Sequence, residues 1–213
     1  MTVRTATFRS QLDYLKQHDH PVIPLRSLVS YLRGEGPAPP PRSVAITADD
    51  GHELVFREMF PIAREYHVPV TLFIYPSAVS NAPYAMTWEQ LDQLRRTGLF
   101  EIQSHTYWHP NFRVEKRRLA PAAYRDFATS QFDRARAALA RRLGASADFI
   151  AWPFGIQDEE LEALARSAGH TAGFTIERRP VRSGERIMAL PRFLVTDGDR
   201  GRRFASILQD GLR

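Results

Sequence analysis

The sequence predicts an α/β fold built on a parallel β-sheet, either open or closed into a barrel. Short apolar runs typical of buried strands alternate with amphipathic stretches typical of helices along most of the 213 residues. The length suits one domain with a sizeable core, so we treat residues 1–213 as a single domain. No apolar run approaches the roughly 18 residues that would span a bilayer.

The N-terminal part is predicted to be helical. Apolar residues recur at helical spacing over about residues 5–18. Ser27 is predicted to be the N-cap of a second helix that stops at Gly34. Residues 34–41 are rich in Gly and Pro and are predicted to form a surface loop.

The rest of the chain alternates between strand and helix. Five strands are predicted, over residues 43–47, 70–74, 100–103, 149–152 and 171–176. Helices are predicted over about residues 53–66, 87–98, 121–143 and 158–168. Thr87, with Gln90 three residues later, is a capping-box sequence, and Gly144 is predicted to end the long helix over 121–143.

Composition and charge exclude several classes of protein. The chain has no cysteine, so it has no disulfide, no thiolate metal site and no cysteine nucleophile. The formal charge is +5, and Lys16 and Lys116 are the only lysines. Because the arginines are interleaved with Asp and Glu, the charge indicates a solvated surface rather than a face that binds nucleic acid.

Two adjacent carboxylates follow the strand at residues 43–47. Working residues of parallel α/β folds lie just past the carboxyl ends of strands. Side chains of Asp49 and Asp50 can share one site only if the strand breaks there, and Gly51 permits that break. Such carboxylates repel each other unless a cation or a proton neutralises them. Taken alone, this motif is interpreted equally well as a functional pair of carboxylates or as a purely structural turn or helix cap.

Two further motifs follow strands. His105 and His109 are four residues apart, as on one face of a helical turn, and can hold one metal together. A carboxylate from Asp50 would complete a His₂Asp set with room for water. Residues 152–155, Trp-Pro-Phe-Gly, form either an apolar turn or the wall of a groove that receives a sugar ring or an oxyanion.

In this order, the Thr-Ala-Asp-Asp-Gly, Ser-His-Thr-Tyr-Trp-His and Trp-Pro-Phe-Gly motifs resemble those of the polysaccharide deacetylase family. This family is also called carbohydrate esterase family four, or the NodB-homology domain. The resemblance covers about residues 5–197 and is strongest to the poly-N-acetylglucosamine N-deacetylase branch. It implies a distorted, incompletely closed (β/α)7 barrel, in this chain with or without its first strand.

The resemblance also implies a mechanism. Asp50, His105 and His109 would bind one divalent metal, most simply zinc, with cobalt, nickel and iron as alternatives. Asp49 would act as the general base that takes a proton from the attacking water. The metal would polarise the acetyl carbonyl, and a backbone N–H would help to hold the oxyanion. The residues implied in substrate binding are Tyr107, Trp152, Pro153 and Phe154.

The chain departs from the family pattern in two places. Many members have an arginine in the third motif that pairs with the base, and we hypothesise that Arg192 takes over this pairing. Relatives often supply a general acid from a late Leu-x-His motif, where this chain has Leu190-Pro191-Arg192 and no histidine follows His170. A strand with a Tyr-His pair precedes this region in the branch, so we expect that the chain begins inside the domain.

Several alternatives stay open at this stage. The chain could be an O-acetyl carbohydrate esterase, or a carbohydrate-binding domain with impaired catalysis; binding to nucleic acid ranks last. The expected partner is an acetylated glycan, with no membrane span and no predicted oligomeric state. The resemblance implies a periplasmic or extracellular location, although the N-terminus lacks a signal peptide, which leaves the cytoplasm open. The remaining histidines are interpreted as surface residues: His18, His20, His52, His67 and His170.

Overall fold

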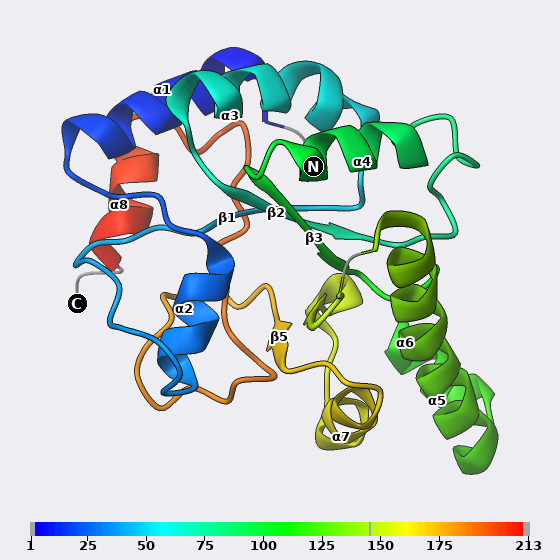
Figure 1. Ribbon diagram of the computed structural model, residues 1–213. Helices are drawn as coiled ribbons and strands as arrows, with labels where there is room; N and C mark the ends of the chain where they lie inside the picture. The colour runs from blue at the N-terminus through cyan, green and yellow to red at the C-terminus, as the bar shows by residue number, and fades with distance from the viewer. Residues whose placement is uncertain (1–2, 145, 211–213) are drawn as a thin grey trace.

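The computed structural model describes residues 3–144 and 146–210 (Figure 1). Five parallel strands pair in sequence order, with β1 and β5 as the two edges of the sheet. The strands are β1 (Ile46–Asp49), β2 (Val70–Ile74), β3 (Phe100–Ser104), β4 (Phe149–Ala151) and β5 (Ala172–Phe174). The sheet curls into a half-barrel that does not close, which confirms the predicted fold class.

Five strands form in the described residues, instead of the seven expected for the complete barrel. Single parallel bridges, Val22 to Val44 and Phe174 to Leu190, add to the sheet. Prolines limit both bridges, because Pro21 and Pro24 flank the first and Pro191 follows the second. Proline has no backbone N–H to donate, so neither bridge extends into a strand.

Helices surround the sheet. They are α1 (Thr5–Gln17), α2 (Leu25–Leu32), α3 (Phe60–Tyr66), α4 (Trp88–Arg96), α5 (Phe112–Arg118), α6 (Pro121–Leu143), α7 (Glu159–Ser167) and α8 (Arg202–Asp210). In Figure 1, α1, α3 and α4 lie together on one side of β1, β2 and β3. Helix α8 packs beside α1, where the Phe204 and Tyr14 rings meet edge to face at 5.8 Å. No helix in the described ranges is long and apolar enough to cross a bilayer.

Local signals in the sequence located most elements. The Thr87 hydroxyl accepts from the Gln90 N–H at 3.2 Å, and the Gln90 side chain accepts from the Thr87 N–H at 2.9 Å. This confirms the predicted capping box. Gly144 has a φ of +60° and ends α6 as predicted.

Other predictions about local structure were wrong. Helix α2 begins at Leu25 after Pro24, so Ser27 lies in its first turn and is not its N-cap. By contrast, the prediction over 53–66 was right, because the chain is helical over these residues, with a π-helical segment, η1 (Val55–Met59), directly before α3. Helices α5 and α8 were not predicted. Helix α5 has a clear start, because the Asn111 side chain accepts from the Val114 N–H at 3.1 Å.

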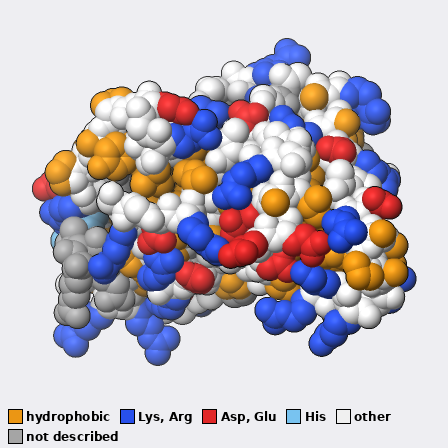
Figure 2. Space-filling model, turned by 90° about the horizontal axis from the view of Figure 1, so that it is seen from below, with side chains coloured by type: hydrophobic (Ala, Val, Ile, Leu, Met, Phe, Trp, Pro, Cys, Tyr) orange, Lys and Arg blue, Asp and Glu red, His pale blue; other side chains and the backbone are white. Residues whose placement is uncertain are grey.

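Charged side chains of both signs share the surface. On the face shown in Figure 2, acidic side chains gather near the middle with basic ones around them. Among the ion pairs at α7, Lys116 Nζ lies 2.7 Å from Asp158 Oδ2, and Arg186 Nη2 lies 3.2 Å from Glu162 Oε1. This arrangement fits the interpretation of the net charge as a solvated surface.

Two histidines interpreted as surface residues are buried. His20 Nδ1 donates to the Arg42 carbonyl at 3.0 Å, because a carbonyl oxygen can only accept. His170 is 2% exposed, and neither of its ring nitrogens has a hydrogen-bond partner among the described residues. The chain turns back at Gly169, so that the His170 N–H bonds to the Ala165 carbonyl and the ring points into the core. Burial, reinforced by the charge of Arg136, lowers the pKa of His170 to about 3.

We expect His170 to make the protein less stable in mild acid. The folded state keeps this ring neutral, whereas the unfolded chain binds a proton below a pKa of about 6.5. Stability is therefore lost as the pH falls from about 6.5 towards 3. Urea unfolding should show that the free energy of unfolding of the wild type falls by about 2 kcal/mol more between pH 7 and pH 5 than that of His170→Leu does.

His67→Asn is the matched control, because His67 is exposed and has a left-handed φ of 54° that asparagine tolerates. It should lose as much stability between the two pH values as the wild type. Equal losses in the wild type and in His170→Leu would contradict the prediction.

Candidate active site

The carboxyl ends of the strands bring the predicted site residues to one edge of the sheet. The register pairs Asp49 with Phe73, Ile74 with Ser104, and Ser104 with Ile150. The residues that directly follow these strand ends therefore lie side by side: Asp50, Tyr75, His105 and Trp152. The interpretation of strand-end motifs as parts of one region is supported by this register.

The backbone leaves the strand at Asp50. Asp50 has a left-handed φ of +71° and Gly51 a φ of +70°, so the extended conformation ends between the two carboxylates. A Cβ atom on Gly51 would lie 3.0 Å from the Ile74 side chain, which also favours glycine there. In an unbroken strand the Asp49 and Asp50 side chains would point to opposite faces of the sheet. The break removes this constraint.

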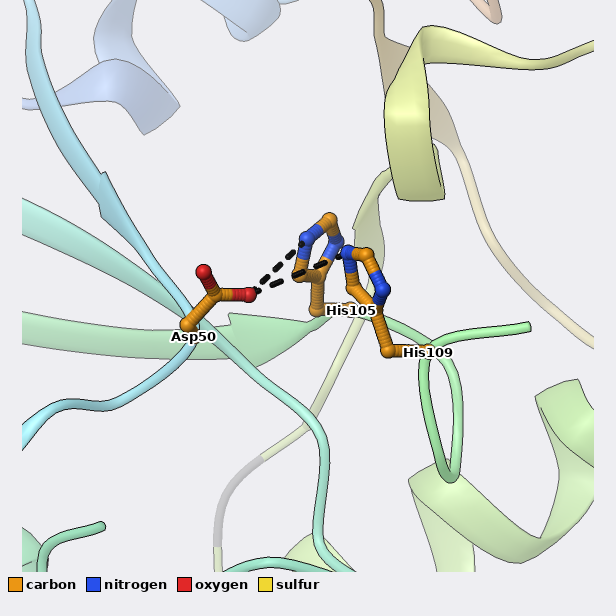
Figure 3. Close-up of side chains that lie close together, drawn as sticks. All are labelled: Asp50, His105 and His109. Atoms are coloured by element: carbon orange, nitrogen blue, oxygen red, sulfur yellow. Dashed lines mark ion pairs between the residues drawn. The ribbon is translucent and has the colours of Figure 1, made fainter. Parts of the chain in front are cut away.

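Three potential metal ligands converge past β1 and β3. Asp50 Oδ1 lies 3.6 Å from His105 Nε2 and 3.8 Å from His109 Nε2, as Figure 3 shows. All three ligand atoms lie within 4.8 Å of one another. The His105 side chain is 4% exposed and that of His109 22%, whereas that of Asp50 is 56% exposed. The group is therefore open to solvent on the side of Asp50.

The four-residue spacing predicted that His105 and His109 lie on one helical turn, but the structure shows that they do not. Residues 105–109 form a loop in which Thr106 and His109 have left-handed φ values of 65° and 64°. The Thr106 hydroxyl accepts from the His109 N–H at 3.2 Å. This compact loop, rather than the pitch of a helix, turns His109 back towards His105.

The donor set fits a divalent metal. His105 Nδ1 lies 2.7 Å from the Ala151 carbonyl, which can only accept, so Nδ1 carries the proton. In the neutral ring, Nε2 then presents its lone pair to Asp50, the orientation found for metal-binding histidines. Burial and the neighbouring His105 ring lower the pKa of His109, which favours the neutral form that a ligand needs.

Asp49 is held by Arg192. Arg192 Nη1 donates to Asp49 Oδ1 at 2.8 Å and Nη2 donates to Oδ2 at 2.9 Å. Arg192 also donates to the Thr47 hydroxyl at 3.0 Å and to the Thr175 carbonyl at 3.1 Å. The structure thus brings together the two residues that the sequence hypothesis paired.

This contact sets the charge of Asp49. Burial alone would raise the pKa of Asp49, but the charge of Arg192 and the hydrogen bonds that Arg192 donates hold it below its ordinary value. Asp49 is therefore ionised at neutral pH. It has the charge state that a general base requires.

The third motif contributes less of the site than predicted. Trp152 is 1% exposed, and its indole N–H donates to the Met188 carbonyl at 2.7 Å. Pro153 is buried as well. The prediction that these two side chains form a groove wall was wrong, because the indole found a buried carbonyl partner and packed into the core. Tyr107 is half-buried, and the Arg134 guanidinium covers its ring at 3.8 Å.

Phe154 is the member of this motif that reaches the site. It is 56% exposed, and its ring centre lies 4.6 Å from that of His109. Its φ is +57°, and within the described chain its N–H donates to no backbone carbonyl. A backbone N–H that is free of other partners can stabilise an oxyanion.

Sequence reasoning missed Tyr84, which lies near the site. Its hydroxyl is hydrogen-bonded to that of Tyr75, and the Tyr75 ring centre lies 5.5 Å from that of His109. Burial and the bond with Tyr84 raise the pKa of Tyr75, so its hydroxyl keeps its proton at neutral pH. The position of Tyr75 directly after β2 was a signal for its place, whereas Tyr84 lies in the following loop, which carries no such signal.

Comparisons with known proteins agree with this geometry. The sequence model of the polysaccharide deacetylase family matches residues 36–173, more than half of the chain. Poly-beta-1,6-N-acetyl-D-glucosamine N-deacetylase of Staphylococcus aureus (strain MRSA252) is 26% identical over 200 residues, covering 92% of this chain and 68% of that protein. The protein of the same name from Staphylococcus epidermidis is 26% identical over 202 residues, with the same coverage.

Solved structures share the fold. IcaB from Ammonifex degensii superposes with a TM-score of 0.85 at 25% identity, covering 98% of this chain and 90% of that one. The Streptococcus pyogenes deacetylase PplD, in complex with acetate, gives a TM-score of 0.84 at 18% identity. That match covers 97% of this chain and 87% of the other, and it supports the fold alone.

We expect one divalent metal to bind per chain and to depend on His105. His105→Ala removes one of three donors, so the affinity for Zn²⁺ should fall at least about 100-fold, since losing even an outer-shell partner can cost 10- to 100-fold. Isothermal titration calorimetry on metal-free protein measures this loss. His67→Asn, at an exposed histidine, should bind like the wild type; unchanged affinity in His105→Ala would place the metal elsewhere.

Proposed function

The chain belongs to the polysaccharide deacetylase family, and from that premise we propose that it removes acetyl groups from a poly-N-acetylglucosamine-like polysaccharide by metal-dependent hydrolysis. The observation that carries the proposal is the convergence of Asp50, His105 and His109, beside an ionised Asp49. Metal ligands and a base at one open edge are what hydrolysis of an amide by activated water requires.

We assign each side chain a role in this reaction. A bound divalent cation would supply a Lewis acid that polarises the acetyl carbonyl and activates water. Asp49 would accept the proton of the attacking water, with Arg192 fixing the carboxylate in place, and would pass this proton to the amine nitrogen as the C–N bond breaks and acetate is released. The Phe154 N–H would donate to the carbonyl oxygen as its negative charge develops. No covalent bond between substrate and chain is needed.

Zinc is our choice for the metal. Two imidazoles and one carboxylate form a donor set that zinc accepts with an open coordination position. Cobalt, nickel and iron accept the same ligands, so the choice rests on the chemistry of zinc as a Lewis acid.

The setting of the reaction follows from the same proposal. Residues 1–213 would form a single deacetylase domain whose partner is an acetylated glycan. We propose a periplasmic or extracellular location, which follows from the resemblance to enzymes that act on a polysaccharide of this kind.

Removal of O-acetyl groups is a second candidate function. Where relatives have a late histidine as general acid, this chain has Arg192, which donates both arms of its guanidinium to Asp49. Arginine does not release a proton in proteins, so Arg192 cannot serve as the acid. An amine must be protonated as it leaves, and an ester depends less on such an acid, which favours the ester as the alternative.

The direct test is acetate release from β-1,6-linked N-acetylglucosamine oligomers. We expect the purified protein with Zn²⁺ to release acetate, a chelator to abolish release, and added Zn²⁺ to restore it. An enzyme-coupled acetate assay measures the rate, and mass spectrometry of the oligomer shows the loss of acetyl groups.

Asp49→Asn, purified in the same way, controls for contaminating enzymes. It should lose about 10²- to 10⁴-fold in rate, because it lacks the proton acceptor, while it still binds Zn²⁺. Zinc-dependent acetate release from O-acetylated oligomers alone would replace the proposed function with the second candidate.

Arg192→Met should lower kcat about 100-fold, because misplacing a reacting group by about 1 Å can cost that much. Zinc affinity should stay unchanged, since Arg192 contacts none of the three ligands. Arg113→Met, at an exposed arginine of α5, is the matched control and should keep full activity. Full activity in Arg192→Met would refute the role of this contact.

A further inference from the structure

An aromatic strip leads away from the metal ligands along the edge of the sheet. We use this name for Tyr75, Tyr84 and His52. The Tyr75 ring lies 5.5 Å from the His109 ring, and its hydroxyl is hydrogen-bonded to that of Tyr84. The Tyr84 ring in turn stacks on His52, with centres 5.9 Å apart and planes 29° apart. The strip therefore connects a metal ligand to the surface loops that follow β1 and β2.

Tyr84 is the exposed member of the strip, and it is held in place. It is 41% exposed, although its hydroxyl is hydrogen-bonded to that of Tyr75 and its ring lies against that of His52. Its carbonyl accepts from the Glu53 N–H at 2.8 Å. His52 is itself fixed, because its Nδ1 accepts from the Leu54 N–H at 3.1 Å.

A ring with a fixed orientation and a free surface is preorganised for binding. An ordinary exposed side chain loses rotamer freedom when a ligand covers it, whereas Tyr84 has lost that freedom already. Tyr31 of α2 shows the contrast, because it is 39% exposed but forms no aromatic pair among the described residues. Exposure alone therefore does not explain the anchoring of Tyr84.

We propose that the Tyr84 ring is a stacking platform for a sugar residue that neighbours the one being deacetylated. This inference rests on the proposed function, since it supposes a glycan at the metal site. Tyr84 lies one aromatic side chain beyond Tyr75, which itself packs on His109. A sugar on Tyr84 would thus be displaced from the reacting acetyl group along the polymer.

The chemistry of both partners fits this placement. A pyranose ring has an apolar C–H face that packs on an aromatic face, and its hydroxyls can bond to polar tips at the rim. Tyr84 offers both an apolar ring and a bonded hydroxyl, with His52 behind it. The platform makes the enzyme selective for a polymer over a single sugar.

The test compares a β-1,6-linked N-acetylglucosamine pentamer with methyl N-acetylglucosaminide, which has one sugar. Tyr84→Ala should lower kcat/KM for the pentamer about 10-fold, mainly through KM, and leave kcat/KM for the single sugar within about twofold. Tyr84→Phe keeps the ring and should stay within about threefold of the wild type on both substrates. Tyr31→Ala should match the wild type on both.

Binding separates this inference from the proposed function. Isothermal titration calorimetry with the zinc-loaded Asp49→Asn protein measures pentamer affinity without turnover, and adding Tyr84→Ala should weaken it about 10-fold. Unchanged pentamer affinity and KM in Tyr84→Ala would overturn the inference, even if acetate is released normally. An equal loss on both substrates would also overturn it, because it would show a general structural role. Pentamer binding that depends on Tyr84, without acetate release by the wild type, would support the platform and refute the proposed function.

Discussion

The contact between Arg192 and Asp49 joins the two open edges of the half-barrel. Leu190 pairs with the β5 edge, and Arg192 then donates to the Thr175 carbonyl on that side and to Thr47 and Asp49 on β1. Among the described residues, no backbone hydrogen bond links β1 to β5, and the Arg192 guanidinium connects the two edges instead. The Arg192 side chain is 13% exposed and that of Asp49 26%. Removing either charge would therefore leave the other largely buried and unpaired, which is destabilising. One interaction thereby holds both the end of the barrel and the orientation of the candidate base.

The rest of the site depends on strained backbone held by a rigid sheet. Eight non-glycine residues of the described chain have a positive φ, and four of them lie here: Asp50, Thr106, His109 and Phe154. Each such conformation costs roughly 1–3 kcal/mol and persists only where the surroundings enforce it. Strand β2, which lies between β1 and β3, is buried at all five positions and supplies that support. The strain is what turns the ligands inward at the strand ends.

Sequence reasoning located the parts of the structure that local rules decide. The Thr87 capping box and the five strands follow from neighbouring residues, and parallel strand ends must share an edge, which brought His105 and His109 together with the carboxylates. The loop that orients the two histidines was not predictable, because its left-handed residues are neither glycine nor asparagine. The burial of Trp152 and His170 was missed for another reason. It depends on contacts distant in sequence, such as the Met188 carbonyl that accepts from Trp152.

With a divalent cation bound, the balance of charges at the site would favour a transition state over a substrate. Asp49 and Asp50 contribute two negative charges and Arg192 one positive charge, while His105 and His109 would hold a metal through neutral rings. The side chains alone thus carry one net negative charge, and a divalent cation would change this to one net positive charge. An acetamide or an acetyl ester is neutral, whereas the addition of hydroxide to its carbonyl carbon produces an anion. A positive, partly buried site would stabilise that anion more than the neutral substrate, which is the differential binding that catalysis requires.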